Sequence, residues 1–368
     1  MVTNPKSPKS NQASSPPPPV AAGSGPAPLT TEEQNAAGIL PASHWTDEPM
    51  EEEDTVDDGA SSIGSFTSTT ASLSSTIFEY RTVHGRTYHG DVGNAESWEP
   101  NDQRHVDAME IYHHAMLVQL DGKLYLSPLD KKKVHRVLDV ATGNGLWAID
   151  FADEFPNAEI IGTDVSPIQP SWIPPNVKFE LDDCNREWTW AANSFDFINM
   201  RMLAGVVEDW DALFRNAFRV CKPGGYVESC GSAITWLSDD GTATEAMEQW
   251  GKVFREGGRK LGRTFAVYEE DLQRKGMEAA GFVDIEFVDI QCPMGVWHPE
   301  KKAAERGLWY KLAVEADLEG YVNYVFNRVM GWSPEETKVF ANHIKKDWNN
   351  PDVHGYYMLR VVYGRKPE

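Results

Sequence analysis

The sequence contains little cysteine and no long apolar run. Its four cysteines form no CxxC pair, and no apolar run approaches the roughly 20 residues that a membrane-spanning helix needs. The N-terminal residues lack the apolar segment that is typical of a secretory signal peptide. These absences predict an intracellular protein with reduced thiols and no membrane span, and they leave cytoplasm and nucleus both open.

Positive charge is also scarce. Against 56 acidic residues there are 34 lysines and arginines, which gives a formal net charge of -22. Non-specific binding to nucleic acid or to anionic lipid requires a basic surface. The composition therefore argues against a direct nucleic-acid or membrane partner. The ten histidines show no metal-ligand spacing of the HExxH type, so we predict no metal site.

The first 76 residues are rich in proline, serine, threonine and acid. They contain SSPPPPV, EPMEEEDTVDD and SSIGSFTSTTASLSST, with too few large apolar side chains to offset the entropy of ordering. We predict disorder over residues 1–76 and a buried core from about residue 79. The segment is either a phosphorylated or partner-binding arm or a solvated tail without a specific role.

The remaining chain has the pattern of an α/β protein. Residues 77–133 include DQRHVDAMEIYHHAMLVQLDGKLYL, whose apolar spacing predicts a helical preface. From residue 134 to residue 368, short apolar runs alternate with helical segments, beginning with VHRVLDV, NAEIIGTDV, VKFEL, FDFINM and GGYVES. This alternation predicts a mostly parallel sheet whose strands share one carboxyl edge, where ligands of such folds bind.

A late helical region interrupts the sheet pattern before its final strand, YMLRVVYG. It extends over about residues 296–350. We interpret it as a helical cap that covers the ligand-binding edge of the sheet.

The loop after VHRVLDV is the strongest local signal. It consists of Ala141, Thr142, Gly143, Asn144 and Gly145. Because glycine has no Cβ, such a loop can turn sharply and let a ligand approach the backbone. The spacing Gly143-x-Gly145-x-x-Ala148 also fits a dinucleotide fingerprint, so NAD remains an alternative cofactor.

Acidic residues follow three successive strands and favour S-adenosylmethionine over NAD. Asp139 would repel a pyrophosphate but hold an ammonium group. Asp164, followed by Val165, would accept the ribose hydroxyls. Asp183 would accept the adenine amine, and the backbone N–H of Cys184 would donate to a ring nitrogen. The alternative is that Asp139 and Asp164 only cap helices.

Asp182 should point away from this site if the strand alternation continues. The Cys184 thiol is not proposed as a nucleophile. We expect Trp147 in the core, and packing rather than adenine stacking for Trp188 and Trp190.

Three side chains are candidates for the acceptor side of the site. His113, His114 or Arg201 could assist a hydroxyl acceptor as a base, and Arg201 could instead hold a carboxylate acceptor by paired hydrogen bonds. A dedicated base is optional, because methyl transfer from a sulfonium depends mainly on alignment.

The core segment VLDVATGNGLWAIDFADEFPNAEIIGTDVSPIQPSWIPPNVKFELDD resembles the fungal LaeA-like methyltransferases, a branch similar to trans-aconitate methyltransferases. Further similar segments are GRTYH, HHAMLVQLDGKLYLSPL, RMLAG, GLWYKL, GWSPEE and VVYGRKP. The resemblance covers about residues 79–368. It implies a class I, seven-stranded Rossmann-like fold that uses S-adenosylmethionine in fungal secondary metabolism. Members either modify small molecules or act as nuclear regulators with velvet-type partners.

The resemblance places the cofactor motif on Asp139, Ala141, Gly143 and Gly145, the ribose acid on Asp164 and the adenine contact on Asp183. Ala141 departs from the usual glycine, and its methyl group would be accepted if the backbone φ there is negative. Three hypotheses remain: a methyltransferase of a small-molecule acceptor, a regulator that acts through protein partners, and an NAD-dependent oxidoreductase.

Overall fold

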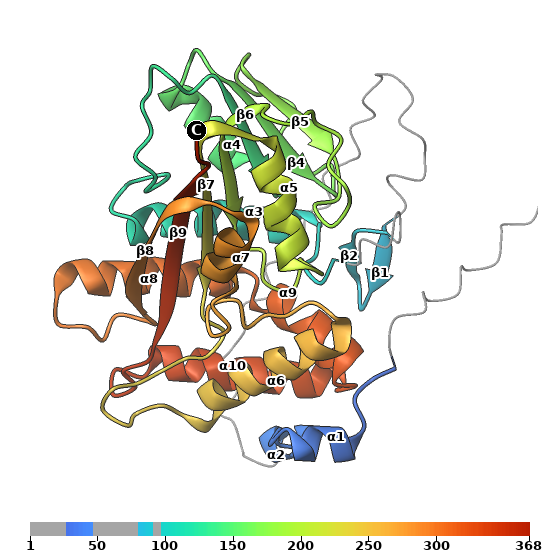
Figure 1. Ribbon diagram of the computed structural model, residues 1–368. Coiled ribbons are helices and arrows are strands. Elements are labelled where there is room, and N and C mark those ends of the chain that lie inside the picture. The colour runs from blue at the N-terminus through green and yellow to red at the C-terminus, as the bar shows by residue number, and fades with distance from the viewer. Residues whose placement is uncertain (1–26, 47–79, 91–96) are drawn as a thin grey trace, which may run out of the picture.

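The structure is a computed structural model that describes residues 27–46, 80–90 and 97–368. Its centre is a seven-stranded sheet in the order β5-β4-β3-β6-β7-β9-β8 (Figure 1). The strands are β3 (Arg136–Val140), β4 (Glu159–Asp164), β5 (Val177–Leu181), β6 (Phe195–Arg201), β7 (Cys221–Ser232), β8 (Val283–Pro293) and β9 (Tyr356–Arg365).

The first five strands of this sheet are parallel, and β9 is antiparallel to both of its neighbours, β7 and β8. Because β3 pairs with β4 on one side and β6 on the other, the strand order reverses beside the glycine loop. That position is the ligand-binding switch point of open α/β sheets. The predicted fold class is confirmed.

Helices cover both faces of the sheet. Helix α4 (Leu146–Glu154) packs on one face, while α5 (Trp210–Val220) and α7 (Leu272–Ala280) pack on the other. Successive strand residues point to opposite faces, so Val137 lies in the α4 core and Leu138 in the α5 core. Trp147 is buried in the α4 core, as predicted.

The preface contains a helix and also a hairpin that the sequence did not suggest. Helix α3 spans Gln103–Gln119, and β1 (Arg81–Val83) pairs with β2 (Arg86–Tyr88). The two-residue turn between the strands has positive φ at both His84 and Gly85. Positive φ at both positions is the condition for the turn that best joins twisted strands. The prediction of a purely helical preface over residues 77–133 is therefore wrong for the hairpin.

The helices between β8 and β9 confirm the predicted insertion before the last strand. They are α8 (Lys301–Ala316), α9 (Leu318–Asn323), the π-helix Tyr324–Val329 and α10 (Pro334–Asn349). Helix α6 (Glu245–Leu261), which follows β7, packs against the π-helix and α10. In Figure 1, α6 and α10 lie below the sheet, and α8 lies beside the lower part of β8 and β9; we call these helices together the cap.

Residues 27–46 are folded, so the prediction of disorder over 1–76 is wrong for this part. Helices α1 (Thr31–Ala36) and α2 (Ala42–Thr46) lie beneath the cap in Figure 1. Trp45 is buried against Phe340 of α10, and the Leu29 N–H donates to the Val329 carbonyl at 2.8 Å. The rest of that prediction falls outside the described residues.

A buried ion-pair network joins the preface to the cap. Asp317, at the start of α9, is fully buried. It accepts a hydrogen bond from the Arg86 guanidinium at 2.7 Å and is 2.8 Å from Nδ1 of His105. Arg86 also donates to Asp102, the N-cap of α3. Hairpin, α3 and α9 are thus held together by one carboxylate.

Candidate functional site

The glycine loop has the tight backbone that its sequence predicts. Gly145 begins α4 with a φ of +80°, and a Cβ at this position would lie 2.3 Å from the Phe179 ring. Gly143 has a φ of +59°. Both positions therefore require glycine for their backbone angle, and Gly145 requires it for space as well.

Ala141 has a φ of +52°, so the condition under which its methyl group would be accepted, a negative φ, is not met. Here an L-residue adopts the left-handed conformation, at a cost of about 1–2 kcal/mol. The backbone at this position therefore keeps the glycine-like angle although the side chain is alanine. The loop stores this strain beside the ligand-binding edge.

Asp139 faces the cavity from the end of β3. It accepts hydrogen bonds from the Asn199 amide at 2.7 Å and from the Thr142 hydroxyl. Burial raises the pKa of Asp139, and these hydrogen bonds oppose that shift. The carboxylate is therefore oriented before any ligand binds.

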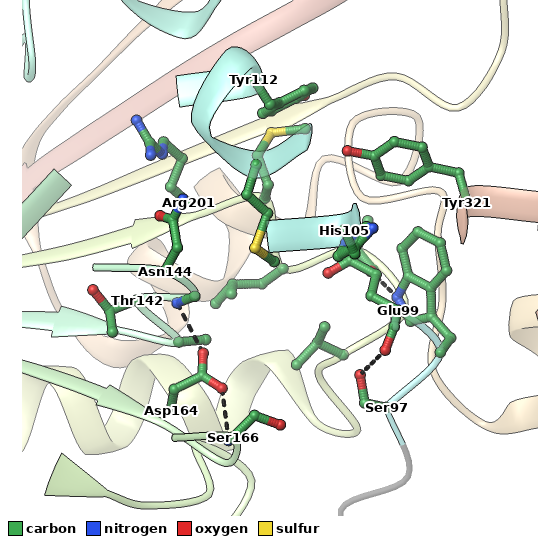
Figure 2. A pocket seen from close by; sticks show the side chains of 18 of the residues that line it. Ser97, Glu99, His105, Tyr112, Thr142, Asn144, Asp164, Ser166, Arg201 and Tyr321 are labelled. Atoms are coloured by element: carbon green, nitrogen blue, oxygen red, sulfur yellow. Dashed lines mark hydrogen bonds between the residues drawn. The ribbon is translucent and has the colours of Figure 1, made fainter. Parts of the chain in front are cut away.

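Asp164 ends β4 and holds the loop from the other side. Its two carboxylate oxygens accept the backbone N–H groups of Gly143 and Ser166, each at 2.9 Å (Figure 2). Burial raises the pKa of Asp164 to about 6. Each oxygen retains a further lone pair, so the carboxylate can still accept ligand hydroxyls. Val165 beside it also lines the cavity.

The residues after β5 differ in part from expectation. Strand β5 ends at Leu181, so the alternation stops, and Asp182 lines the cavity together with Asp183 and Cys184. The condition for Asp182 to point away, a continued strand alternation, is therefore not met. Asp183 accepts from the backbone and side-chain amides of Asn185. Burial raises the pKa of the Cys184 thiol to about 12, which agrees with its exclusion as a nucleophile.

Of the three acceptor-side candidates, the structure brings two together. Arg201 donates to Nδ1 of His113 at 3.0 Å, and Nε2 of His113 is 2.9 Å from the Asp150 carboxylate. His113 and Arg201 both line the cavity. His114 is exposed and packs edge-on against Trp309, so it does not belong to the site.

The two tryptophans after β5 have packing roles, as predicted. Trp188 is buried and donates to the Cys184 carbonyl at 3.2 Å. Trp190 packs edge-on against both Trp188 and Phe195. Neither ring lines the cavity.

These groups surround one cavity of about 270 Å³ at the carboxyl edge of the sheet. Its other walls include side chains of the preface and the cap. The sequence predicted a cap over this edge, but it did not indicate which of its side chains line the site. The lining residues that were missed include Trp98, Glu99, Asn101, Trp236, Trp250, Phe254 and Tyr321. Among the described residues, Oδ1 of Asn101 and Nδ2 of Asn144 are buried in this lining without a hydrogen-bond partner.

No helix in the described part of the chain is both long and apolar enough to span a membrane. Across residues 27–46, 80–90 and 97–368, no group of three or more His, Cys, Asp or Glu side chains has the arrangement of a metal site.

Comparisons with known proteins agree with the geometry. A family model described as a methyltransferase domain matches residues 112–287. The chain is 33% identical to "Methyltransferase pytC" of Aspergillus terreus, over 82% of this chain and 92% of that protein. It is also 33% identical to "Probable methyltransferase tdiE" of Emericella nidulans, over 73% of this chain and 84% of that protein.

A third relative is described as a regulator. The chain is 31% identical to "Secondary metabolism regulator LAE1" of Cochliobolus heterostrophus, over 77% of this chain and 94% of that protein. The methyltransferase domain overturns the NAD-dependent alternative for the glycine loop. The chain belongs to the family of fungal methyltransferases that includes pytC, tdiE and the secondary-metabolism regulator LAE1.

Proposed function

We propose that the chain binds S-adenosylmethionine in this cavity and transfers its methyl group to a small molecule of fungal secondary metabolism. One observation carries the proposal. The glycine loop and the carboxylates after β3, β4 and β5 converge on a single cavity that the cap closes with aromatic rings.

The residues at the sheet edge fit this cofactor. Asp139 would hold the ammonium group, Asp164 with Val165 the ribose, and Asp183 with the Cys184 N–H the adenine. The buried amide nitrogen of Asn144 offers a donor without a partner in the described chain. Acid-rich walls suit a ligand whose net charge is positive.

Arg201 would hold the carboxylate of the methionine end. In the sheet register Met200 lies beside Val140, which brings Arg201 next to Ala141 and the glycine loop. Burial raises the pKa of Asp139, and the charge of Arg201 is close enough to oppose this rise. Arg201 and Asp139 would then bind the two opposite charges of an amino-acid group.

His113 serves as a positioning residue for Arg201. Burial lowers the pKa of His113, so the ring is neutral at pH 7. Because Nδ1 accepts from Arg201, the proton lies on Nε2 and faces Asp150. Neither ring nitrogen is then free to act as a base.

When bound, S-adenosylmethionine supplies a methyl group on a sulfonium, which is a good leaving group. The chain's own contribution is alignment, which can be worth about 7–11 kcal/mol in favourable cases. The aromatic lining of the cavity favours a small-molecule acceptor over the side chain of a protein substrate. The rings of Trp236, Trp250 and Phe254 line the cavity and belong to one apolar core with the residues of α10 and the π-helix.

The test is calorimetric titration with S-adenosylmethionine of the wild type, Asp164→Asn and the control Asp153→Asn. Asp153 is an exposed aspartate on α4. We expect Asp164→Asn to weaken binding by about tenfold or more, as the loss of a charge-assisted hydrogen bond predicts, while Asp153→Asn has no effect. Equal affinities for all three proteins would contradict the proposed site.

A second candidate is a regulatory protein whose chemistry is secondary. It is favoured by the printed description of the relative LAE1. Incubation of the purified chain with labelled cofactor and fungal metabolite extracts distinguishes the methyltransferase from the regulator. A labelled small molecule supports the methyltransferase, whereas cofactor binding without any labelled small product favours the regulator.

A further inference from the structure

Glu99 is an acid in the cavity that the cofactor proposal does not use. It lies in the preface between the hairpin and α3, and its side chain lines the cavity between Trp98 and Pro100. In Figure 2, Glu99 and Asp164 approach the cavity from different sides. The Glu99 carboxylate has no hydrogen bond and no ion pair with any residue of the described chain.

Other charged groups of this cavity already have partners. Asp139 is bonded to Asn199, Asp164 to backbone N–H groups and Asp183 to Asn185. The basic groups are engaged as well. Arg201 bonds His113, Arg263 pairs with Glu208, and His105 pairs with Asp317.

His105 is the basic neighbour of Glu99. Burial raises the pKa of Glu99, and the nearby His105 opposes this rise. The two side chains are not hydrogen-bonded, because Nδ1 of His105 is 2.8 Å from Asp317 and its Nε2 has no partner in the described chain. The Glu99 carboxylate therefore keeps its hydrogen-bonding capacity for a ligand.

Aromatic rings lie next to this carboxylate. Trp98 packs edge-on against Phe265 with ring centroids 5.0 Å apart, and Tyr321 is tilted against Trp98 at 6.4 Å. All three rings line the cavity. A carboxylate among electron-rich rings is a favourable setting for an ammonium group, which gains an ion pair and cation–π contacts.

We propose that the acceptor is a small amine whose ammonium group pairs with Glu99 and lies against the rings of Trp98 and Tyr321. The inference rests on the proposed methyltransferase function and adds the chemical class of its acceptor. It separates the acidic groups into two sets. Asp139, Asp164 and Asp183 serve the cofactor, and Glu99 serves the acceptor.

The experiment uses matched probes on the full chain saturated with S-adenosylhomocysteine. Tryptamine carries the ammonium group, tryptophol replaces it by a hydroxyl, and indole-3-acetate carries a negative charge. Phenethylamine and 2-phenylethanol repeat the comparison on a smaller ring. Calorimetric titration gives the affinity of each probe for the wild type, Glu99→Gln and the control Glu110→Gln, which replaces an exposed glutamate of α3.

We expect each amine to bind at least about tenfold more tightly than its alcohol, the gain that one charged hydrogen bond provides. Glu99→Gln should abolish this preference, and Glu110→Gln should keep it. Equal binding of amines and alcohols, tighter binding of the anion, or no amine binding at millimolar concentration would overturn the proposal.

A second arm separates this proposal from the function on which it rests. Glu99→Gln should bind both S-adenosylmethionine and S-adenosylhomocysteine as the wild type does. If Glu99→Gln weakens only S-adenosylmethionine, the carboxylate serves the sulfonium, and the amine proposal is overturned. If the wild type binds neither adenosyl ligand, the proposed function itself fails.

Discussion

The two halves of the cavity are built in different ways. The proposed cofactor half comprises Asp139, the loop 141–145, Asp164 and Asp183, and the proposed acceptor half comprises Trp98, Trp236, Trp250, Phe254 and Tyr321. Each carboxylate of the cofactor half is oriented by hydrogen bonds, for example Asp164 by the Ser166 N–H and Asp183 by Asn185. The acceptor half instead joins rings up to more than 200 positions apart. Hydrogen bonds therefore orient one half, and tertiary packing of aromatic rings assembles the other.

The largest effect should follow from breaking the buried ion-pair network that joins the preface to the cap. Asp317→Asn leaves Arg86 and His105 buried without their carboxylate, and removal of one partner of a buried ion pair costs about 3–5 kcal/mol. Urea unfolding should show this loss. The control Glu319→Gln, at a partly exposed partner of Arg104, should change stability by less than about 1 kcal/mol.

The stability that Asp317 contributes should also depend on pH. Burial opposes ionisation of Asp317, but hydrogen bonds from His105 and Arg86 hold its pKa below the usual value. The ionised Asp317 therefore contributes fully to the free energy of unfolding above the ordinary aspartate pKa of about 4. This contribution is lost as the pH falls through the lower pKa that Asp317 has in the folded protein. The stability difference between wild type and Asp317→Asn should narrow at low pH. A constant difference would contradict the network.

The next largest effect should follow from a substitution in the glycine loop of the cofactor half. Gly145→Ala adds a Cβ 2.3 Å from the Phe179 ring at a φ of +80°. Backbone strain and overpacking together predict a loss of about 2–5 kcal/mol. Gly122 has the same φ of +80° with no atom within 4 Å of its Cβ position, so Gly122→Ala should cost about 1 kcal/mol. Equal denaturant midpoints for both variants would contradict the close approach of Phe179.

A further prediction tests whether Arg201 binds the methionine end of the cofactor. Arg201→Ala should weaken S-adenosylhomocysteine by about 10–100-fold, the worth of a charged hydrogen bond. It should leave 5′-methylthioadenosine unaffected, because that ligand lacks the amino-acid group. Calorimetric titration of both ligands checks the difference. A similar loss for both would place Arg201 outside the methionine site.

The smallest effect concerns the strained alanine. Ala141→Gly removes the cost of a left-handed L-residue and should raise the free energy of unfolding by about 1 kcal/mol. Ala279→Gly, at an exposed position of α7, should instead lower it by about 1 kcal/mol. Destabilisation by both variants would show that Ala141 is not strained.

The residues of the proposed cofactor half could be named from the sequence because they follow the ends of strands, and the structure brings them to one cavity. It could not predict the acceptor half, because Trp98, Trp250 and Tyr321 meet only through packing of the preface and the cap. His114 was a wrong candidate for a geometric reason. One helical position rotates a side chain by about 100°, which turns it away from the side of His113.

The fold of residues 27–46 was missed because the surrounding composition is polar. A local signal was present, since Thr30 and Glu33 form a capping box at the start of α1. The apolar residues Ile39 and Trp45 follow it and are buried. Short helices of this kind depend on tertiary contacts, which sequence periodicity does not report.

Hydrogen exchange tests most directly whether the cavity is divided into a cofactor half and an acceptor half. Amide exchange is measured on the full chain alone and saturated with S-adenosylhomocysteine. The account predicts protection in the loop 141–145 and in the segments after β4 and β5, with little change in α8 and α9. Protection confined to the cap, with unchanged exchange in the loop, would contradict it.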